Sequence, residues 1–460
     1  MELEKEIKFN KNFKCALVHT PQFCENPDGT LYSNVNFCAM GLYPLAGELK
    51  KEGFDVEILH IGIEKYLDKN FSLSKYVKDN SVKFLAFSLH WHPQSFSVIE
   101  TIRKLKKECP DVFIVLGGFT ASYFAKEILK EFGFIDTIIA GEGEIPISLL
   151  AKRVFYGYKD DLEKIPNIVW KKDGEIIRNR EKFVALSKDL DTFKFFDIKT
   201  MRNYEHYAKI PFVLNYAKEE ELNNPMTSQG VCLGRGCTGN CTWCGGGYEA
   251  LKKVIGRDFI SYRSADSVID EIKTLKKGCG IEVFRFAFDP DPKDRKHLIT
   301  LLEKISDEFC GKLTAAFTLF RLPDKEFLEL YSKAFSKESI LSISPEFYNE
   351  DLRKRHKSFY FSNNELEEAL DYMEELQIRS ELYFSIIPSV DKKENEKSED
   401  YGKFLQKKYS FVQQYMIIPI IYEPASPWTL CPEKFGIKKE AVPKKFLDYY
   451  NNTKIETEFI

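Results

Sequence analysis

Short apolar runs alternate with segments of helical spacing over the first third of the chain. The apolar runs have the length of buried strands and stand at residues 13–19, 55–61, 82–89, 111–118 and 135–144. Helical patterns lie between them, for example at 39–51 and 95–110. Strands that are separated by helices indicate a parallel, doubly wound sheet. We therefore predict an α/β domain of the Rossmann-like type over residues 1–150.

Residues 151–225 have a less regular pattern. The segment 167–179 alternates like a β-hairpin, and Asp173-Gly174 supplies the residues that a tight two-residue turn requires. The segment 189–200 lacks either periodicity and reads as a connection between domains. We expect residues 151–225 to be a linker that contains a hairpin.

The β/α alternation returns at residue 226. An apolar strand is expected at 226–234, and later strands at 282–288, 313–319, 339–347, 379–387 and 411–421, with helical patterns between them. About six β/α units predict a partial TIM-type barrel over 226–430, whose chemistry lies at the carboxyl ends of the strands. The charge run 391–400 reads as a solvated loop or helix start, and residues 431–460 as a C-terminal helical tail.

Composition narrows the function classes. The chain has 460 residues, with 43% hydrophobic side chains and 67 Lys and Arg against 70 Asp and Glu. The net charge of -3 provides no overall positive field for a nucleic-acid backbone, so no nucleic-acid partner is expected. The charged start of the sequence has no apolar core of a secretory signal, and no apolar run approaches the ~18–20 residues of a membrane span. These features predict a cytoplasmic protein without a membrane span.

Four of the eleven cysteines lie within thirteen residues of one another, one inside the first expected barrel strand and three directly after it. The other seven are scattered, as expected of small buried side chains. Cys237, Cys241 and Cys244 form a C-x3-C-x2-C pattern among glycines. Three thiolates on a short loop suit three irons of a [4Fe–4S] cube and leave one iron open. The alternatives are a structural zinc site with Cys232 as fourth ligand, or unliganded thiols.

This segment resembles the signature of the radical S-adenosylmethionine (SAM) enzymes. In that family C-x3-C-x2-C follows the first strand of a (β/α)6 partial barrel, and an aromatic residue, here Trp243, precedes the third cysteine. The resemblance implies that Cys237, Cys241 and Cys244 ligate the cluster, that SAM chelates the open iron, and that Trp243 lies at the cofactor. It further implies that an electron from a flavodoxin or ferredoxin cleaves SAM to methionine and a 5′-deoxyadenosyl radical, which abstracts hydrogen from the substrate.

The predicted N-terminal sheet carries polar and glycine-rich loops at its strand ends, where open parallel sheets bind ligands. A sheet with Gly-Gly-Phe-Thr-Ala-Ser at 117–122 and Gly-Glu-Gly-Glu at 141–144, placed before a cysteine-cluster barrel, resembles the cobalamin-binding radical SAM subfamily over residues 13–430. The resemblance implies cobalamin (B12) contacts at these loops: Thr20, Ser88, His90, His92, Gly117, Gly118, Thr120, Glu142 and Gly143.

The sequence departs from one cobalamin motif. Residues 19–24 read His-Thr-Pro-Gln-Phe-Cys, where methionine-synthase-like domains carry D-x-H-x-x-G, so that motif supplies no lower axial histidine. His90 and His92 are candidates to face the corrin, and the alternative is that they are ordinary loop residues. A Rossmann-like sheet without ligand is the alternative for the whole domain.

The family's SAM contacts map onto later strand ends. Asp289 stands near the place of the usual glycine/glutamate segment for the SAM amino group, and Ser344 and Glu346 end a later strand. Arg355 follows in a basic stretch with Arg353 and Lys357, and an arginine suits the SAM carboxylate; the alternative is a solvated helix face. The glycine-rich segment expected near 384–389 reads Phe-Ser-Ile-Ile-Pro-Ser, and residues 422–428 suit either a substrate mouth or packing.

These features predict a cobalamin-dependent radical SAM enzyme, a methyltransferase that acts on an unactivated carbon through a 5′-deoxyadenosyl radical and methylcobalamin. One alternative is a radical SAM enzyme for ring closure or rearrangement, with cobalamin in another role or with a vestigial B12 domain. An alternative of another class is a non-catalytic iron–sulfur or cobalamin sensor. The sequence names neither the substrate nor a catalytic side chain beyond the cofactor ligands.

Overall fold

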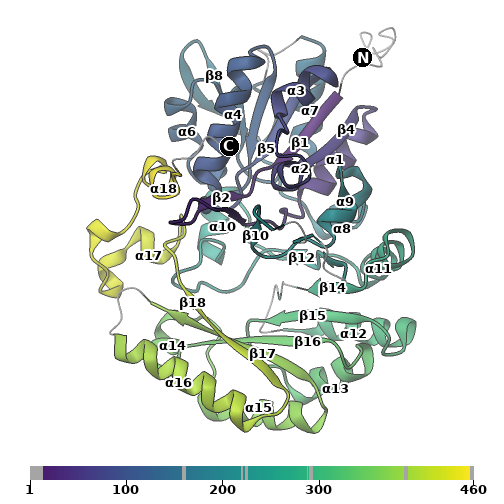
Figure 1. The fold of residues 1–460 in the computed structure, drawn as a ribbon, viewed down its shortest axis with the longest axis vertical. Coiled ribbons are helices and arrows are strands. Elements are labelled where there is room, and N and C mark those ends of the chain that lie inside the picture. The colour runs from purple at the N-terminus through teal and green to yellow at the C-terminus, as the bar shows by residue number, and fades with distance from the viewer. Residues whose placement is uncertain are drawn as a thin grey trace. The chain divides into compact units, whose positions relative to one another are not determined.

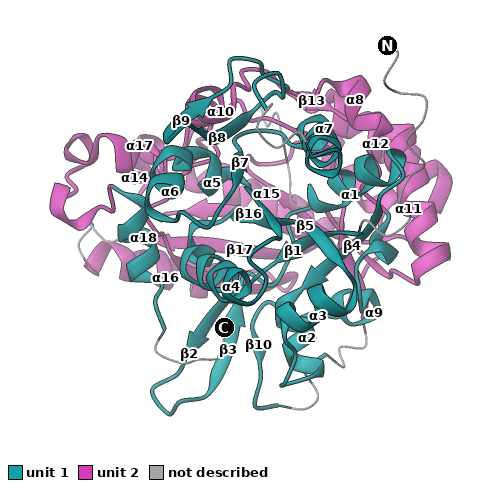
Figure 2. Cartoon of the chain, turned by 90° about the horizontal axis from the view of Figure 1, so that it is seen from above, with its two compact units in different colours: residues 1–183, 197–222, 445–460 teal, residues 184–196, 223–444 magenta. Residues whose placement is uncertain are grey.

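The computed structural model describes residues 14–157, 162–218, 221–222, 226–286, 289, 294–387 and 392–455. The chain forms two compact units (Figure 2). Unit 1 contains residues 1–183, 197–222 and 445–460, and unit 2 contains residues 184–196 and 223–444. The charged start of the sequence, which carries the expectation of no secretory signal, lies outside the described residues. The four-part division predicted at 150, 225 and 430 stays a prediction about domains.

Unit 1 is built on a seven-stranded sheet of order β4-β1-β5-β6-β7-β8-β9 (Figure 1). The first five of these strands pair in parallel, which confirms the predicted doubly wound sheet. The hairpin is confirmed as well, because β8 and β9 pair antiparallel around Asp173 and Gly174, which both have positive φ. The strands are β1 (Lys14–His19), β4 (Asp55–His60), β5 (Val82–Ser88), β6 (Phe113–Gly117), β7 (Thr137–Ile139), β8 (Ile168–Lys172) and β9 (Glu175–Arg178).

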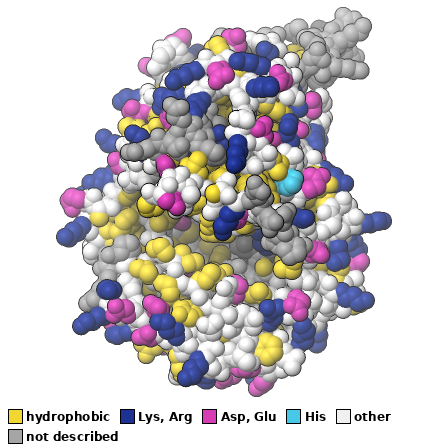
Figure 3. Space-filling model, viewed as in Figure 1, with side chains coloured by type: hydrophobic (Ala, Val, Ile, Leu, Met, Phe, Trp, Pro, Cys, Tyr) yellow, Lys and Arg dark blue, Asp and Glu magenta, His cyan; other side chains and the backbone are white. Residues whose placement is uncertain are grey.

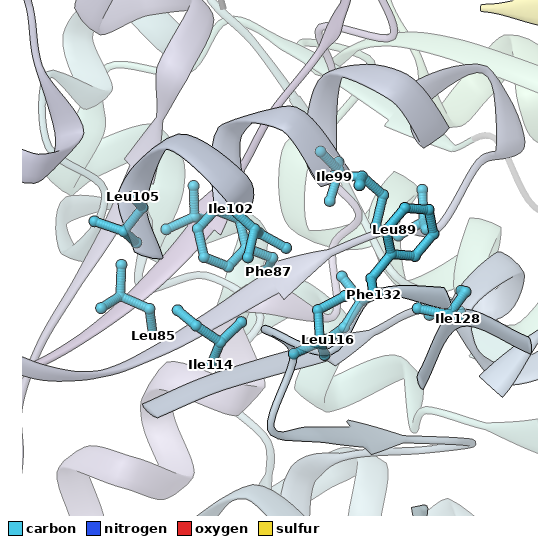
Figure 4. Close-up of a cluster of buried hydrophobic side chains, with 14 of the residues drawn as sticks. Leu85, Phe87, Leu89, Ile99, Ile102, Leu105, Ile114, Leu116, Ile128 and Phe132 are labelled. Atoms are coloured by element: carbon cyan, nitrogen blue, oxygen red, sulfur yellow. The ribbon is translucent and has the colours of Figure 1, made fainter. Parts of the chain in front are cut away.

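The core of unit 1 follows from the alternation of side chains along β5 and β6. Residues two apart in a strand share a face, so Leu85 and Phe87 point with Ile114 and Leu116 toward the same helices (Figure 4). Those helices supply Ile99, Ile102 and Leu105 from α4 and Ile128 from α6. The helices with the clearest sequence patterns are α1 (Leu42–Lys51), α4 (Ser95–Glu108), α6 (Ala125–Glu131) and α7 (Glu144–Phe155).

A small antiparallel sheet in unit 1 was not expected from the sequence. Its order is β10-β3-β2, formed by β2 (Gln22–Glu25), β3 (Leu31–Asn34) and β10 (Leu214–Asn215). These strands have two to four residues, too few for a period-2 pattern to stand out. This sheet ties the segment that follows β1 to residues 214–215.

Unit 2 contains a six-stranded parallel sheet of order β11-β14-β15-β16-β17-β18, with the strands in chain order. Helices α11 (Ala265–Cys279), α12 (Lys296–Phe309), α13 (Lys325–Ala334), α15 (Asn363–Glu375) and α16 (Lys392–Lys408) separate the strands after β11. This arrangement confirms the predicted partial barrel. The strands are β11 (Ser228–Gly230), β14 (Val283–Phe286), β15 (Thr314–Leu319), β16 (Ile340–Glu346), β17 (Arg379–Ile386) and β18 (Val412–Pro419).

One local expectation in unit 2 is wrong, and another is met by one of its two stated alternatives, a helix start. The run 226–234 is not one strand: β11 ends at Gly230, and Gly234–Arg235 forms β12, which pairs antiparallel with β13 (Ser261–Tyr262). A side chain at Gly234 would meet the Ser261 carbonyl oxygen at 2.4 Å, so a glycine permits this close pairing. The charge run at 391–400 belongs to α16 from Lys392 onward, and Asp391 lies outside the described residues.

Charged side chains of both signs are interspersed over the face shown in Figure 3, in keeping with the small net charge. In the part of the chain that the structure describes, no helix combines the length and apolarity that crossing a bilayer requires.

Candidate functional site

The cysteine loop of unit 2 follows β12, and its three cysteines are partly buried. Each sulfur accepts a hydrogen bond from a backbone N–H group: Gly239 N to Cys237 Sγ (3.3 Å), Ser358 N to Cys241 Sγ (3.4 Å) and Gly246 N to Cys244 Sγ (3.3 Å). Backbone N–H donors on cysteine sulfurs are the interactions that tune iron–sulfur clusters. The donor set and its surroundings therefore fit a [4Fe–4S] cluster.

The surroundings of Cys244 keep its thiol protonated unless a metal binds. Burial raises the pKa of Cys244 well above its ordinary value, and the nearby Glu423 carboxylate raises it further, as do Cys241 and Cys237. A coordinating metal deprotonates such thiols outright. The positive charge of bound irons would attract all three thiolates and so offset the repulsion between them.

Cys232 has a different environment. It is buried, and its thiol donates a weak hydrogen bond to the Gly234 carbonyl, with a sulfur–oxygen distance of 3.7 Å. Burial raises its pKa. A thiol that donates to a carbonyl is protonated, whereas a zinc ligand is a thiolate. The structure thus gives Cys232 the role of a small buried side chain.

One later segment holds the middle of the cysteine loop. It runs from His356, the last residue of α14 (Glu350–His356), to Ser358. Thr242 N donates to the His356 carbonyl at 2.9 Å, and the Thr242 hydroxyl lies 2.8 Å from His356 Nδ1. Asn240 N donates to Ser358 Oγ at 2.6 Å. With the Ser358 N–H on Cys241, these bonds fix the second cysteine from outside its own loop.

A second segment, residues 423–428 after β18, holds the end of the loop. Gly245 N donates to Glu423 Oε2 at 2.6 Å, and Trp428 N donates to the Thr242 carbonyl at 2.9 Å. A Cβ at Gly245 would lie 2.4 Å from the Pro424 carbonyl oxygen. The third cysteine is therefore bracketed by contacts on both sides. Sequence reasoning left residues 422–428 open between substrate mouth and packing, and it missed their contact with the cysteine loop.

Trp243 belongs to an aromatic group at this end of unit 2. Its ring lies edge-on to Phe347 and Trp428, with centroid distances of 5.9 and 6.2 Å. Trp428 is fully buried and also packs on His356. Trp243 is thus placed to exclude water from one side of the cysteine loop, and its contact with a cofactor stays a prediction.

Glu346 occupies an unusual backbone position at the end of β16. Its φ is +66°, and the pairing with β17 shifts register between Ile343 and Glu346. Its carboxylate accepts a short hydrogen bond from the Ser385 hydroxyl and lies 3.6 Å from Lys357 Nζ. A non-glycine residue with positive φ is costly and often marks a functional site. The irregularity at the carboxyl end of β16 thus sets the direction of the Glu346 side chain, the predicted SAM contact.

Lys357 links this strand end to the cysteine loop. The side chain is buried, and Nζ donates to the carbonyl of Ser344, another predicted SAM contact. Burial lowers the Lys357 pKa, while the negative charges of Glu346 and Cys241 oppose that shift. Lys357 therefore interacts electrostatically with both the second cysteine and Glu346. The basic residues around it in the sequence gave no sign that Lys357 is buried beside a carboxylate.

The two arginines of α14 differ sharply. Arg355, the predicted partner of the SAM carboxylate, is exposed. Arg353 is fully buried and donates to the carbonyls of Pro345, Phe347 and Phe361 and to Asn363 Oδ1. Arg353 thereby holds the segment after β16, a role that sequence reasoning missed.

Asp289 is fully buried and already faces a cation of its own unit. Arg295 donates to Asp289 Oδ2 at 2.9 Å and also to the carbonyls of Leu322 and Arg321. The surrounding residues 287–288 and 290–293 lie outside the described part of the chain. Its predicted contact with the SAM amino group stays a prediction.

The predicted cobalamin contacts of unit 1 gather at one edge of the sheet. The last residues of neighbouring strands stand in register: His60 beside His19, His19 beside Ser88, Ser88 beside Gly117, and Gly117 beside Ile139. Thr20 follows this row directly, is fully buried, and has an Oγ1 without a hydrogen-bond partner among the described residues. An orphaned buried hydroxyl at the carboxyl edge of a parallel sheet fits a site for a polar ligand.

The loops after β5 and β6 pack against each other at this edge. Gly118 has a φ of +102°, and a Cβ there would meet the Leu89 carbonyl oxygen at 2.6 Å. The Thr120 hydroxyl donates to the His90 carbonyl at 3.0 Å. The structure therefore brings His90, Gly118 and Thr120 together, as a shared ligand loop requires.

His92 and the 141–144 loop complete the predicted set. The His92 ring packs edge-on to Tyr449 at 4.9 Å, and burial lowers its pKa to about 4. Its Nε2 also lacks a hydrogen-bond partner within the described residues. Glu142 is buried, its carbonyl accepts from Asn167 Nδ2 at 2.8 Å, and Gly143 precedes α7.

A buried group near this edge, His19, Cys38 and His60, has the composition of a metal site. Both nitrogens of His60 are already bonded, Nε2 to the Asn36 carbonyl at 2.8 Å and Nδ1 to Ile63 N at 3.1 Å. His19 Nε2 bonds the Val35 carbonyl at 2.8 Å. The two rings thus anchor the 35–36 loop, and His60 also caps the helix α2 (Ile61–Leu67).

Comparison with known proteins agrees with this two-part architecture. The family model "B12 binding domain" matches residues 35–151, and the model "Radical SAM superfamily" matches residues 231–405. Among curated proteins, hopanoid C-3 methylase of Methylococcus capsulatus is 23% identical over 260 residues, 55% of this chain and 44% of that protein. Anaerobic magnesium-protoporphyrin IX monomethyl ester cyclase of Synechocystis is 24% identical over 316 residues, 66% of this chain and 56% of that protein.

Among solved structures, the radical SAM methyltransferase TsrM of Kitasatospora setae superposes with a TM-score of 0.65 at 16% identity, covering 90% of this chain and 74% of that one. This likeness shows a shared fold. The chain spans about half the length of the two curated relatives described above. The order of a B12-binding domain and a radical SAM domain on one chain, predicted from the loops and the cysteine motif, places this protein in the cobalamin-binding radical SAM family.

Proposed function

We propose that this protein is a cobalamin-dependent radical SAM methyltransferase that acts on an unactivated carbon. The observation that carries the proposal is the three-cysteine loop with an N–H donor on each sulfur, on a chain that also has a B12-binding domain. The similarity to a hopanoid methylase and to the fold of a methyltransferase supports methyl transfer. A flavodoxin or ferredoxin as electron donor and a cytoplasmic location belong to the same proposal.

Each cofactor has a set of residues in this proposal. Cys237, Cys241 and Cys244 hold the cluster, and Ser344 and Glu346 contact SAM at the end of β16. The cobalamin contacts are the loop residues at the carboxyl edge of the sheet in unit 1. When bound, the cluster supplies the electron for SAM cleavage and cobalamin supplies the methyl group.

The protein's own share of the chemistry is to orient and to exclude water. Lys357 and Ser385 hold the Glu346 carboxylate in one direction, so that it meets an amino or hydroxyl group of SAM without reorganisation. The aromatic rings of Trp243, Phe347 and Trp428 keep water from one side of the cysteine loop. Asp289 and Arg355 are further proposed SAM contacts.

Anaerobic reconstitution tests the proposal. We expect about four irons per chain and a bound corrin spectrum, and in turnover both S-adenosylhomocysteine and 5′-deoxyadenosine. Alanine at Cys237, Cys241 or Cys244 should abolish the cluster signal. Cys232→Ala is the matched control and should keep it, because that thiol faces a backbone carbonyl. Zinc in place of iron, or a reconstituted protein that binds no corrin, would contradict the proposal.

A second candidate is a radical SAM enzyme for ring closure. The similarity to the anaerobic cyclase of Synechocystis, over 66% of this chain, favours it. Methyl transfer consumes one SAM as methyl donor and another as radical source, whereas ring closure needs only the radical. Formation of 5′-deoxyadenosine without S-adenosylhomocysteine would therefore select the second candidate.

A further inference from the structure

We propose that Glu423 is a positioning residue for the cluster: its carboxylate fixes the backbone after the third cysteine and so sets the hydrogen bond on the Cys244 sulfur. The inference rests on the proposed function, since it assigns a residue to the cluster of that site. It adds a contact that lies more than 170 positions from the cysteine motif.

The end of the cysteine loop has a backbone with few intrinsic restraints. Cys244 is followed by three glycines, which have the largest backbone freedom of any residue. Gly246 N nevertheless points at Cys244 Sγ at 3.3 Å. A glycine run holds such a direction only where something outside it restrains the backbone.

Glu423 supplies that restraint. Its Oε2 accepts the N–H of Gly245, the residue between Cys244 and the donor Gly246, at 2.6 Å. The backbone is equally close, because a Cβ at Gly245 would lie 2.4 Å from the Pro424 carbonyl oxygen and 3.2 Å from Glu423 Cβ. Glu423 therefore holds the peptide group between Cys244 and Gly245, which directly precedes the peptide group that carries the Gly246 N–H.

The segment that carries Glu423 is itself held by hydrogen bonds. Ala425 has a φ of +65°, and the Ser426 side chain accepts from Thr429 N at 3.3 Å, which caps α17 (Pro427–Leu430). Trp428 N then donates to the Thr242 carbonyl at 2.9 Å. The same short segment thus grips the loop on both sides of Cys244, at Thr242 and at Gly245.

The consequence concerns the cluster's electronic properties. Hydrogen bonds to ligating sulfurs help to set the reduction potential of a cluster. Removal of the groups that orient metal ligands typically lowers metal affinity by about 10–100-fold. Loss of the Glu423 acceptor should release Gly245 and weaken the Gly246 bond to Cys244. Glu423 acts through the backbone and does not touch the reacting atoms in this proposal.

Two substitutions in the full-length protein separate this role from simple structural support. Glu423→Gln keeps an oxygen acceptor of the same reach for the Gly245 N–H, whereas Glu423→Ala removes it. After anaerobic reconstitution we expect Glu423→Gln to match wild type in the electron paramagnetic resonance spectrum of the reduced cluster. Glu423→Ala should show shifted g values, an altered spectral response to SAM, and loss of iron to a chelator about 10-fold faster than wild type. Glu433→Ala removes an exposed carboxylate nearby and is the control.

The possible results separate failure of this inference from failure of the proposed function. A wild-type spectrum, SAM response and chelator rate in Glu423→Ala overturn the inference and leave the proposed function standing. Equal disturbance in Glu423→Gln and Glu423→Ala, with both variants folded by circular dichroism, also overturns it, because the acceptor would then not be the property that matters. A wild-type protein that takes up no iron overturns the proposed function and this inference with it.

Discussion

Single buried charges decide the geometry at the end of β16. Arg353 and Lys357 lie four positions apart on the basic stretch 353–357, and both send their charged groups to backbone carbonyls. Those carbonyls, of Ser344 and Pro345 among others, border Glu346. A cation that satisfies several carbonyls at once fixes an irregular backbone without regular pairing. The positive φ of Glu346 is tolerated because its neighbours are held in this way.

Replacement of Arg353 by methionine should lower the free energy of unfolding by about 3 kcal/mol or more, because several buried carbonyls lose their donor. The neighbouring Arg355→Met substitution removes the same charge from an exposed position and should stay within about 0.5 kcal/mol of wild type. Urea denaturation followed by circular dichroism measures both. Equal loss in the two variants would show that net charge, rather than the buried hydrogen bonds, is responsible.

The sequence distinguished little at this scale. The run Glu350-Asp-Leu-Arg-Lys-Arg-His-Lys357 begins with two acidic residues and continues with basic ones, and all of these charges suit a solvated helix face. Which of its cations is buried depends on carbonyls at 344–347 and 361, and no local pattern reports those contacts. The cysteines are the opposite case, because their spacing alone carries the chemistry. The hydrogen bond between Glu423 and Gly245 could not be predicted, because the two residues lie far apart in the sequence.

Elements were predictable where their pattern is long. β15 alternates between buried and half-buried positions over six residues, and α4 spans 14 residues with one apolar face, so both follow from local sequence. β2, β3 and β10 are short and exist through mutual pairing across the chain. The end of β11 was also misplaced, because the apolar run continues past it into β12. Turn and strand-end positions are set by tertiary partners, which a single sequence does not contain.

His60 couples two elements of unit 1 and makes their stability depend on pH. Its ring caps α2 and bonds the Asn36 carbonyl. Burial lowers its pKa from 6.5 to about 4, against the opposing effect of the Asn36 bond. Between these values the unfolded chain binds a proton that the folded chain does not. The contribution of His60 is therefore complete above pH 6.5 and is lost as the pH falls toward 4.

The His60→Gln variant isolates this effect, since its amide still offers a donor for the Asn36 carbonyl but does not titrate. From pH 7 to pH 4, wild type should lose about 3 kcal/mol more of its free energy of unfolding than the variant. Denaturation at a series of pH values measures the difference. Parallel curves for the two proteins would show that His60 is charged in the folded state or does not contribute.

At the scale of the whole molecule, the chain returns to unit 1 after completing unit 2. Residues 445–460 belong to unit 1 together with 197–222, whereas 184–196 belong to unit 2 (Figure 2). α18 (Phe446–Asn452) is anchored by Phe446 N on Glu127 at 2.9 Å and by the Tyr450 hydroxyl on Glu100 at 2.6 Å. The Tyr449 ring of this helix packs on His92, one of the predicted cobalamin contacts. α18 is thus part of the core that supports the sheet edge at which the cobalamin contacts are predicted.

Phe446→Ala tests this return of the chain. The ring is fully buried and packs on Phe124 and Phe132, each with a centroid distance of 5.8 Å. Its removal should cost unit 1 about 3–5 kcal/mol, because the apolar contacts are lost and a cavity remains. Hydrogen exchange should therefore accelerate in α4 and α6 of unit 1, while α15 of unit 2 keeps its protection. Phe404→Ala, at a half-exposed ring on α16, removes the same group with little effect. Faster exchange in α15, or unchanged exchange in α4, would show that α18 does not stabilise unit 1 specifically.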